Sequence, residues 1–271
     1  MVQGLKRRKS TNIGMNVTNE EMVDFHTHIL PGMDDGAKDA EESKKMLQML
    51  VQQGVHTVCL TPHFYPYKET LEAFLNRREQ AFSQIQPYAA EMGLRFVLAS
   101  ETFFNDYLFH SEDISPLCMK GSDGRSYLLT EMPFDSHFSD HTVSRISRLI
   151  DIYGVNPVLA HIERYPKLVN NKKLIDRLID MGCLMQINLS VFEKGFFLKK
   201  RILSYIAKNM VHVVGTDSHN TEKRPPKYSE GISVIQKSLG EDAVNQLSRN
   251  AQQITGLCQE KFAIWGLHEM N

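Results

Sequence analysis

Imidazole and carboxylate side chains follow the apolar segments of this chain in a regular way. His26 and His28 stand two residues apart at the end of one such segment, and Asp217 and His219 repeat that spacing after another. Because side chains at positions i and i+2 of a strand point to the same side, each pair can present two metal-binding groups together. Residues of the same kind follow four further apolar segments, namely His63, Glu101, Glu131 and His161.

The number of these residues predicts a cluster of metal ions. Five histidines, two glutamates and one or two aspartates are more ligands than a single ion uses. The additional aspartate would come from Asp34-Asp35-Gly36, which can equally be a simple turn. Imidazoles and carboxylates without thiolates suit manganese, zinc or iron, so we expect two or three divalent ions of this kind.

Clustered metal ions favour one kind of chemistry. One ion lowers the pKa of a bound water, and the others hold the phosphoryl oxygens and the leaving group while metal-bound hydroxide attacks in line. Such a site needs no nucleophile from the protein, and Cys59 is expected to lie deep in a strand. The ligand pattern therefore predicts hydrolysis of a phosphate ester.

Short apolar segments alternate with amphipathic ones, which predicts parallel strands joined by helices. Asp39 can cap the first helix, with Glu42 reaching back to it. Glycines at positions 54, 93, 154 and 182 stand between a helix and the next strand, where a left-handed backbone ends a helix cheaply. The expected strands are residues 22–26, 55–61, 95–100, 126–131, 156–161, 183–188 and 211–216, and the expected helices are residues 40–53, 70–92, 140–153, 171–181, 197–209 and 228–238.

These units can form an open sheet or a closed barrel. An open sheet gathers its ligands mainly at one switch point, whereas here metal-binding residues follow nearly every strand. Only a closed barrel brings so many strand ends to one mouth. We therefore expect a single-domain α/β barrel over residues 22–271, for which we count seven strands.

Composition narrows the class of protein. The 271 residues suit one barrel-sized domain, and the net charge of -1 gives no global reason to expect binding to nucleic acid or an anionic membrane. No apolar run is long enough to cross a bilayer. The four cysteines form no CxxC pair, which suits free thiols in the cytoplasm. Residues 1–21 are polar and include a basic run, so we expect a disordered extension, with a weak electrostatic tether as the alternative.

The chain resembles the PHP (polymerase and histidinol phosphatase) metallohydrolases. Within them, it is similar to the bacterial manganese-dependent protein-tyrosine phosphatases of capsule and exopolysaccharide loci. The resemblance extends from about residue 23 to residue 256. It depends on Glu101, Glu131 and four motifs, namely DFHTHILPGMDDGA at 24–37, TPH at 61–63, PVLAHIERY at 157–165 and VVGTDSHNTEKRPP at 213–226.

This resemblance implies a distorted, TIM-like (β/α)7 barrel of the PHP fold. It implies that Arg164 and Arg224 bind phosphate, which suits the bidentate geometry of a guanidinium. The implied substrate is phosphotyrosine on a partner protein, often a membrane-associated bacterial tyrosine kinase that regulates polysaccharide synthesis. The implied ligands of a trinuclear metal site are His26, His28, Asp35, His63, Glu101, Glu131, His161, Asp217 and His219.

Other functions stay open at this stage. A PHP phosphatase for a small metabolite such as histidinol phosphate, a non-phosphatase amidohydrolase and a scaffold that binds a kinase without turnover are the alternatives. His137 or His141 can be a general acid for the leaving phenolate, or a surface histidine. One or two aromatic residues near the mouth can pack against an aryl phosphate. The candidates are Phe64, Tyr65, Tyr67, Phe103, Phe104, Tyr107, Phe134, Phe138 and Tyr165.

Overall fold

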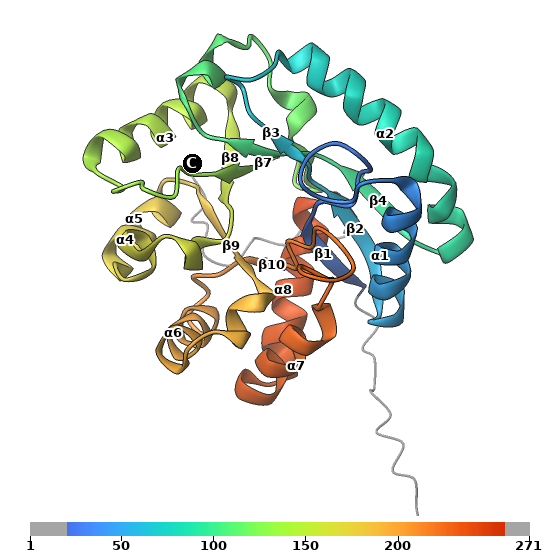
Figure 1. Ribbon diagram of the computed structural model, residues 1–271. Coiled ribbons are helices and arrows are strands. Elements are labelled where there is room, and N and C mark those ends of the chain that lie inside the picture. The colour runs from blue at the N-terminus through green and yellow to red at the C-terminus, as the bar shows by residue number, and fades with distance from the viewer. Residues whose placement is uncertain (1–20, 258–271) are drawn as a thin grey trace, which may run out of the picture.

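The apolar segments of the sequence form short parallel strands that curl around a common axis (Figure 1). The computed structural model describes residues 21–257, so the extension expected at residues 1–21 lies outside the described residues except for its last member. The strands are β1 (Met22–Thr27), β2 (Val55–Leu60), β3 (His63–Phe64), β4 (Arg95–Leu98), β5 (Glu101–Phe103), β6 (Met119–Lys120), β7 (Ser126–Glu131), β8 (Val155–Leu159), β9 (Leu184–Asn188) and β10 (Val213–Gly215).

Parallel pairing runs around the whole ring. Strand β1 pairs with β2, and β2 with β4. Strands β2 and β4 are then interrupted. Their continuations, β3 and β5, pair with each other. Pairing continues through β5, β7, β8, β9 and β10. The ring closes where the N–H of Asp217 donates to His26 O at 2.8 Å and the N–H of His28 donates to Ser218 O at 2.9 Å.

The distorted seven-stranded barrel expected from the sequence is thus confirmed. Every expected strand is present. The strands expected at 55–61 and 95–100 are shorter and each is followed by a second short piece, and the strand expected at 211–216 is limited to β10. The antiparallel pairing of β6 with β7, in the connection that the sequence left undefined, was not expected. Both interruptions lie next to candidate ligands, because β3 begins at His63 and β5 at Glu101.

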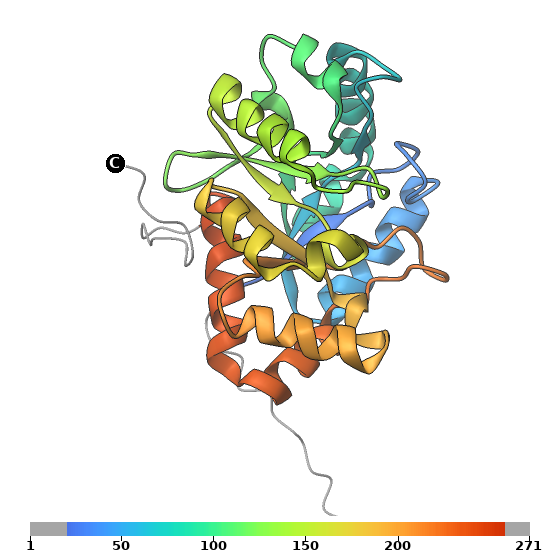
Figure 2. The ribbon, with the colours of Figure 1, turned by 90° about the vertical axis from the view of Figure 1, so that its left-hand side faces the viewer.

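Helices surround the ring of strands, as the two views in Figures 1 and 2 show. Six of them match the expected helices, whereas the short α4 and the long α8 were not predicted. The α-helices are α1 (Ala40–Gln52), α2 (Leu71–Met92), α3 (Asp140–Tyr153), α4 (Pro166–Val169), α5 (Lys172–Asp180), α6 (Phe196–Ile206), α7 (Tyr228–Leu239) and α8 (Glu241–Ile254), and the 3-10 helices are η1 (Asp106–His110), η2 (Ser115–Leu117), η3 (Ile162–Arg164) and η4 (Leu189–Glu193).

Local sequence signals explain where helices begin and end. The Asp39 carboxylate accepts from the N–H of Glu42 at 2.8 Å, as expected for a cap. The Glu42 carboxylate reaches back one residue further than expected, because it accepts from the N–H of Lys38 at 3.1 Å. All four glycines expected to end helices have a left-handed backbone: Gly54, Gly93, Gly154 and Gly182.

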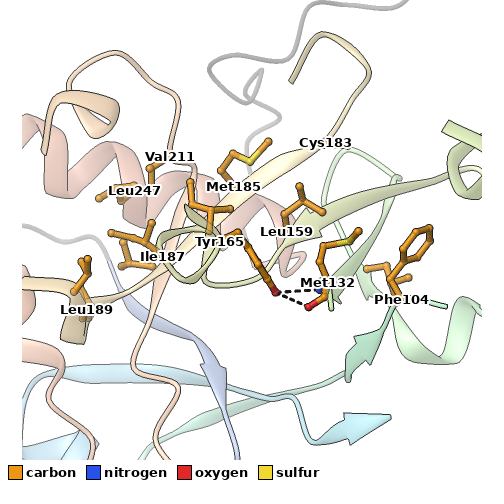
Figure 3. Packing of buried hydrophobic residues seen from close by; sticks show 14 of the residues in the cluster. Phe104, Met132, Leu159, Tyr165, Cys183, Met185, Ile187, Leu189, Val211 and Leu247 are labelled. Carbon is orange, nitrogen blue, oxygen red and sulfur yellow. Dashed lines mark hydrogen bonds between the residues drawn. The ribbon is translucent and has the colours of Figure 1, made fainter. Parts of the chain in front are cut away.

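Two apolar clusters support the ring. The larger lies between helices and strands, and Figure 3 shows part of it. Here the Tyr165 hydroxyl is bonded to both the N–H and the carbonyl of Met132, each at 3.0 Å. The smaller cluster takes residues from nearly every strand and includes Ala251 and Ile254 of α8, which lies on the side of the ring away from the β–α loops (Figure 2). Packed apolar side chains therefore support the strands on the side of the barrel away from the mouth.

Cysteine and membrane expectations can be checked over the same residues. Cys59, Cys118 and Cys183 are buried, free thiols, and Cys258 lies outside the described residues. Within residues 21–257, no helix combines the length and the apolarity needed to cross a bilayer.

His212 makes the stability of this barrel depend on pH. The ring is fully buried, and its Nδ1 accepts from the N–H of Met185 at 3.0 Å, so the imidazole is neutral. Burial lowers the pKa of His212 to about 3. The unfolded chain binds a proton below about pH 6.5 and the folded chain does not, so stability is lost as the pH falls through that value.

We predict that wild-type protein and His212→Asn differ in pH dependence. The asparagine oxygen keeps an acceptor for Met185 but cannot titrate. Between about pH 7 and pH 5, the wild type should lose about 2 kcal/mol more unfolding free energy than the variant. Urea unfolding of both proteins in chelator measures this difference. Parallel pH profiles would show that His212 is not held neutral in the fold.

Candidate metal centre

Strand ends and β–α loops together bring all eight metal-binding residues found at the apolar segments, together with Asp35, to one mouth. His26 lies in β1 and His28 just after it, so the barrel's first strand supplies two imidazoles. Glu131 is the last residue of β7. Glu101, expected at the end of a strand, instead begins β5, because the strand is interrupted at residues 99–100. The N–H of Glu101 donates to Pro62 O at 3.0 Å, which fixes the carboxylate beside the β2–β3 interruption.

Two of these residues have a left-handed backbone. The φ angle is 34° at His161 and 52° at Asp217, and only two other non-glycine residues of the described chain have positive φ. Such conformations are costly and tend to persist where the surroundings enforce them. Here the N–H of His161 donates to Gln186 Oε1 at 2.6 Å, and the N–H of Asp217 to His26 O. Both side chains are thereby directed toward the mouth.

Glu101 is at the centre of the cluster. Its carboxylate is 1% exposed, and Oε2 lies 3.2 Å from His26 Nε2, 3.3 Å from His28 Nε2 and 3.0 Å from His63 Nδ1. Oε1 lies 2.9 Å from His161 Nε2. One carboxylate therefore contacts four imidazoles from three strand ends, two of them from β1.

Asp217 also lies close to the two β1 histidines. Its Oδ1 lies 3.7 Å from His26 Nε2 and 3.4 Å from His28 Nε2. Its Oδ2 accepts from Asn188 Nδ2 at 2.7 Å and from Arg224 Nη2 at 2.8 Å. These donors fix one oxygen of Asp217 and leave the other facing the imidazoles.

The remaining candidates complete the rim. Exposed Asp35 places Oδ1 3.3 Å from His219 Nε2 and 3.6 Å from His63 Nε2. Glu131 lies 3.7 Å from both His63 and His161. Three groups of side chains have ligand atoms close enough to hold an ion: His28, Asp35, His63 and His219; His26, His28 and Asp217; and His63, Glu101 and Glu131.

Hydrogen bonds at the back of the rings determine which nitrogens face the centre. Asp34 Oδ2 lies 2.7 Å from His28 Nδ1, and Gln186 Oε1 lies 3.4 Å from His26 Nδ1. With Nδ1 protonated in each ring, the two Nε2 atoms carry lone pairs, and they are only 3.1 Å apart. Two facing lone pairs repel unless a cation lies near both. Buried Glu101 Oε2, His63 Nδ1 and His219 Nε2 also have no hydrogen-bond partner. This donor set fits metal ions.

Sequence reasoning did not assign roles to several residues that position this centre. Asp34 was considered only as an alternative ligand, yet both its oxygens are used as acceptors, one by Gly36 N–H at 2.9 Å and the other by His28 and His63. Gln186 and Asn188 are two apart on β9 and bond to one another at 3.0 Å. Their i, i+2 spacing is the only signal in the sequence.

Asp24, the first residue of the D-x-H-x-H pattern, was also missed. It is fully buried, and it accepts from Thr216 N at 2.8 Å and from Thr216 Oγ1 at 2.6 Å. Burial raises the pKa of Asp24 to about 6, against these hydrogen bonds. Asp24 thus joins the first strand to the last. The two backbones approach so closely that a Cβ on Gly215 would lie 2.6 Å from His26 Cβ.

The charges of the centre are strongly coupled. Burial disfavours protonation of His28, but Asp34, Asp217 and Glu101 outweigh it and hold the pKa of His28 well above its ordinary value. Burial would raise the pKa of Glu101, yet the imidazoles of His26 and His63 hold it well below its ordinary value. Burial, with Glu101 nearby, raises the pKa of Glu131 to about 7. Without ions, protonated imidazoles supply the positive charge that these carboxylates require.

A cavity of about 590 Å³ opens over the centre. Arg164 and Arg224 line it, with Arg164 Nη1 3.5 Å and Arg224 Nη2 2.8 Å from Asp217 Oδ2. Of the nine aromatic candidates, Tyr65 and Phe134 line the cavity. Tyr65 stacks on His63 at 5.1 Å, and Phe134 on His161 at 5.8 Å.

His137 and His141 are placed differently. Both are exposed described residues, and neither is among those that line the cavity. The static geometry therefore gives no support to a general-acid role for either.

Comparisons with known proteins agree with this geometry. Residues 22–255 match the family model described as capsular polysaccharide synthesis, CpsB/CapC. The chain is 34% identical over 233 residues to tyrosine-protein phosphatase CpsB of Streptococcus pneumoniae. The aligned region covers 83% of this chain and 94% of that protein.

Solved structures give the same result. A crystal structure from work on YwqE of Bacillus subtilis and CpsB of Streptococcus pneumoniae, described as metal-dependent tyrosine phosphatases, superposes with a TM-score of 0.70 at 26% identity over 86% of this chain and 94% of the other. A phosphotriesterase homology protein from Escherichia coli shares the fold alone, with a TM-score of 0.53 and 12% identity over 87% and 98% of the two chains. With a family model that matches nearly all of the described residues, this chain belongs to the CpsB/CapC family of capsular polysaccharide synthesis.

Proposed function

We propose that this protein is a metal-dependent phosphatase that hydrolyses phosphotyrosine on a partner protein. The observation that carries the proposal is the convergence of nine candidate ligands at one mouth, beneath a cavity that two arginines line. The names of its relatives, tyrosine-protein phosphatases of capsule synthesis, support the same activity. The partner that we propose is a membrane-associated tyrosine kinase that regulates polysaccharide synthesis.

The proposed ligands hold three divalent ions, with manganese as the expected metal. The three groups of ligand atoms described above support this number. His161 joins the group around Glu131, because its Nε2 lies 3.7 Å from that carboxylate. When bound, such ions would supply an activated water and offset charge on the phosphoryl group.

Arg164 and Arg224 bind the phosphoryl oxygens in this proposal. Both guanidinium groups line the cavity, and both are partly exposed to it, at 33% and 36%. Their contacts with Asp217 hold them beside the centre without burying them. A guanidinium in this position can donate two parallel hydrogen bonds to a phosphate.

Tyr65 and Phe134 form the aromatic walls for the substrate ring. Phe134 is 57% exposed, so its face is available to an aryl group. Arg164 lies over the same ring, 5.6 Å from its centroid, which places an aromatic wall and a phosphate-binding cation together. A phenolate is a good leaving group, which is consistent with a cavity that neither His137 nor His141 lines.

Restoration of activity by metal tests the proposed function. We expect chelated protein to lose activity on a phosphotyrosyl peptide and to regain it best with manganese, when manganese, zinc, iron and magnesium are added separately. The specificity constant for the peptide should exceed that for histidinol phosphate by about 100-fold or more. The reverse preference would favour the metabolite phosphatase, and full activity after exhaustive chelation would contradict both.

Substitution of ligands tests the site. We expect Glu131→Ala and His219→Ala to lose about 100-fold or more in specificity constant while their circular dichroism is retained. The matched control is Asp176→Ala, which removes only a surface pair with Lys172. Wild-type turnover by either ligand variant after metal reconstitution would contradict the assignment.

Asp34→Asn should weaken metal binding without removing a proposed ligand. Both Asp34 oxygens are acceptors, and an amide keeps only one. His28 and His63 then lose part of their orientation, so we expect metal affinity to fall about 10- to 100-fold. Titration calorimetry with Mn²⁺ measures it, with Asp176→Asn as the control. Equal affinity in both variants would show that Asp34 has no positioning role.

Metal binding should release protons. Because the pKa of His28 is held well above its ordinary value in the ion-free protein, that proton must leave before Nε2 can bind an ion. We therefore expect affinity for Mn²⁺ to fall as the pH is lowered from about 8 to 6, with about one proton or more released per protein. Calorimetry in two buffers of different ionisation enthalpy counts these protons. Identical heats in both buffers would contradict the charge state described above.

A further inference from the structure

Two neighbouring phenylalanines project from the start of α6. Phe196 is 71% exposed and Phe197 is 83% exposed, and their ring centroids are 5.8 Å apart. Every other large hydrophobic side chain in the described residues is less exposed. Isolated exposed apolar residues are common, but an adjacent aromatic pair at this exposure calls for a function.

The packing of α6 does not account for this pair. The helix buries Ile202, Tyr205 and Ile206 against the barrel, and Leu198 is packed against the same core. These positions follow helical periodicity and satisfy the apolar face of the helix. Phe196 and Phe197 lie beyond that face, where solvent rather than the core surrounds them.

Basic residues flank the aromatic pair. Residues 193–201 carry four cations, Lys194, Lys199, Lys200 and Arg201, against one anion, Glu193, for a net charge of +3. The anion is already paired, because Glu193 Oε1 lies 2.7 Å from Lys227 Nζ. Within residues 21–257, no ion pair involves Lys199 or Lys200. The near-zero charge of the whole chain conceals this local excess.

This surface lies on the same side of the barrel as the candidate metal centre. It follows β9, whose last residue, Asn188, donates to Asp217. In the segment between β9 and α6, Ser190 and Glu193 line a small pocket together with Arg164 and Arg224. Whatever contacts the start of α6 is therefore close to the mouth of the barrel.

We propose that the start of α6, comprising Lys194, Phe196, Phe197, Lys199 and Lys200, docks on the surface of an anionic lipid bilayer. Aromatic rings enter the interface between headgroups and acyl chains, while lysines attract acidic headgroups. A second copy of this chain fits less well, since a symmetric contact would bring the same lysines together. The contact would turn the mouth of the barrel toward the membrane. The proposal goes beyond the phosphatase activity, and its test requires no turnover.

Vesicle sedimentation tests this docking. Metal-loaded protein should sediment with phosphatidylcholine vesicles that contain about one-third phosphatidylglycerol, remain in solution with pure phosphatidylcholine, and be released by high salt. We expect Phe196→Ser/Phe197→Ser and Lys199→Gln/Lys200→Gln each to bind about tenfold or more weakly. Both should cleave a soluble phosphotyrosyl peptide at the wild-type rate if the proposed activity holds, and circular dichroism checks their fold independently of activity.

Matched controls lie near the C-terminal ends of helices rather than at the start of α6. Ile152→Ser removes a 50%-exposed side chain near the end of α3, and Lys208→Gln/Lys237→Gln removes two exposed cations near the ends of α6 and α7. Both should bind vesicles like the wild type. Wild-type binding by the phenylalanine variant would overturn the proposal. Absence of vesicle binding would also overturn it if light scattering showed a phenylalanine-dependent dimer. It would do so equally if the protein bound an acidic peptide in a phenylalanine-dependent way.

Discussion

The rest of this structure depends on the repulsion within its centre. Four imidazole nitrogens are crowded around the buried carboxylate of Glu101 at distances near 3 Å, with Asp217 close to two of the same rings. No arrangement of neutral side chains would be stable there, so positive charge must be supplied, either by protons or by ions. The fold therefore has to hold groups together that repel each other whenever that charge is absent.

Closure of the barrel provides this constraint. Asp24 bonds to Thr216, and His26 and His28 bond to the backbone beyond β10, so the ring is sealed at the strand that carries two of the ligands. Tyr165 bonds to Met132, which ties the loop after β8 to the end of β7. Each tie lies within a few residues of a candidate ligand. The same contacts that complete the fold thus fix the geometry of the centre. They maintain the left-handed backbone at Asp217, while Gln186 maintains that at His161.

The sequence pattern alone identified eight of the nine candidate ligands because their signal is local, whereas Asp35 was assigned through the family resemblance. A polar residue next to an apolar strand is visible in one dimension, and a parallel barrel gathers strand ends without further information. The residues behind them could not be found in this way, because Gln186 and Asn188 become meaningful only when β8, β9 and β10 are adjacent. Helix α8 was missed because its buried face makes polar contacts as well as apolar ones. Asn250 donates to His212 O, and Ser248 donates to Glu21 O. Of the nine aromatic candidates, four proved to be buried, which no sequence pattern foretold: Phe64, Phe104, Phe138 and Tyr165.

The seal between the first and last strands has a consequence for biosynthesis. Asp24 and Thr216 are 192 residues apart, so the beginning of the chain leaves the ribosome long before its partner exists. At ordinary rates of translation, that interval is roughly 10–40 s. During it, His26 and His28 belong to an unfinished sheet with an exposed edge. The nascent chain then needs protection from aggregation, and a stable catalytic pocket can be completed only after synthesis has nearly ended.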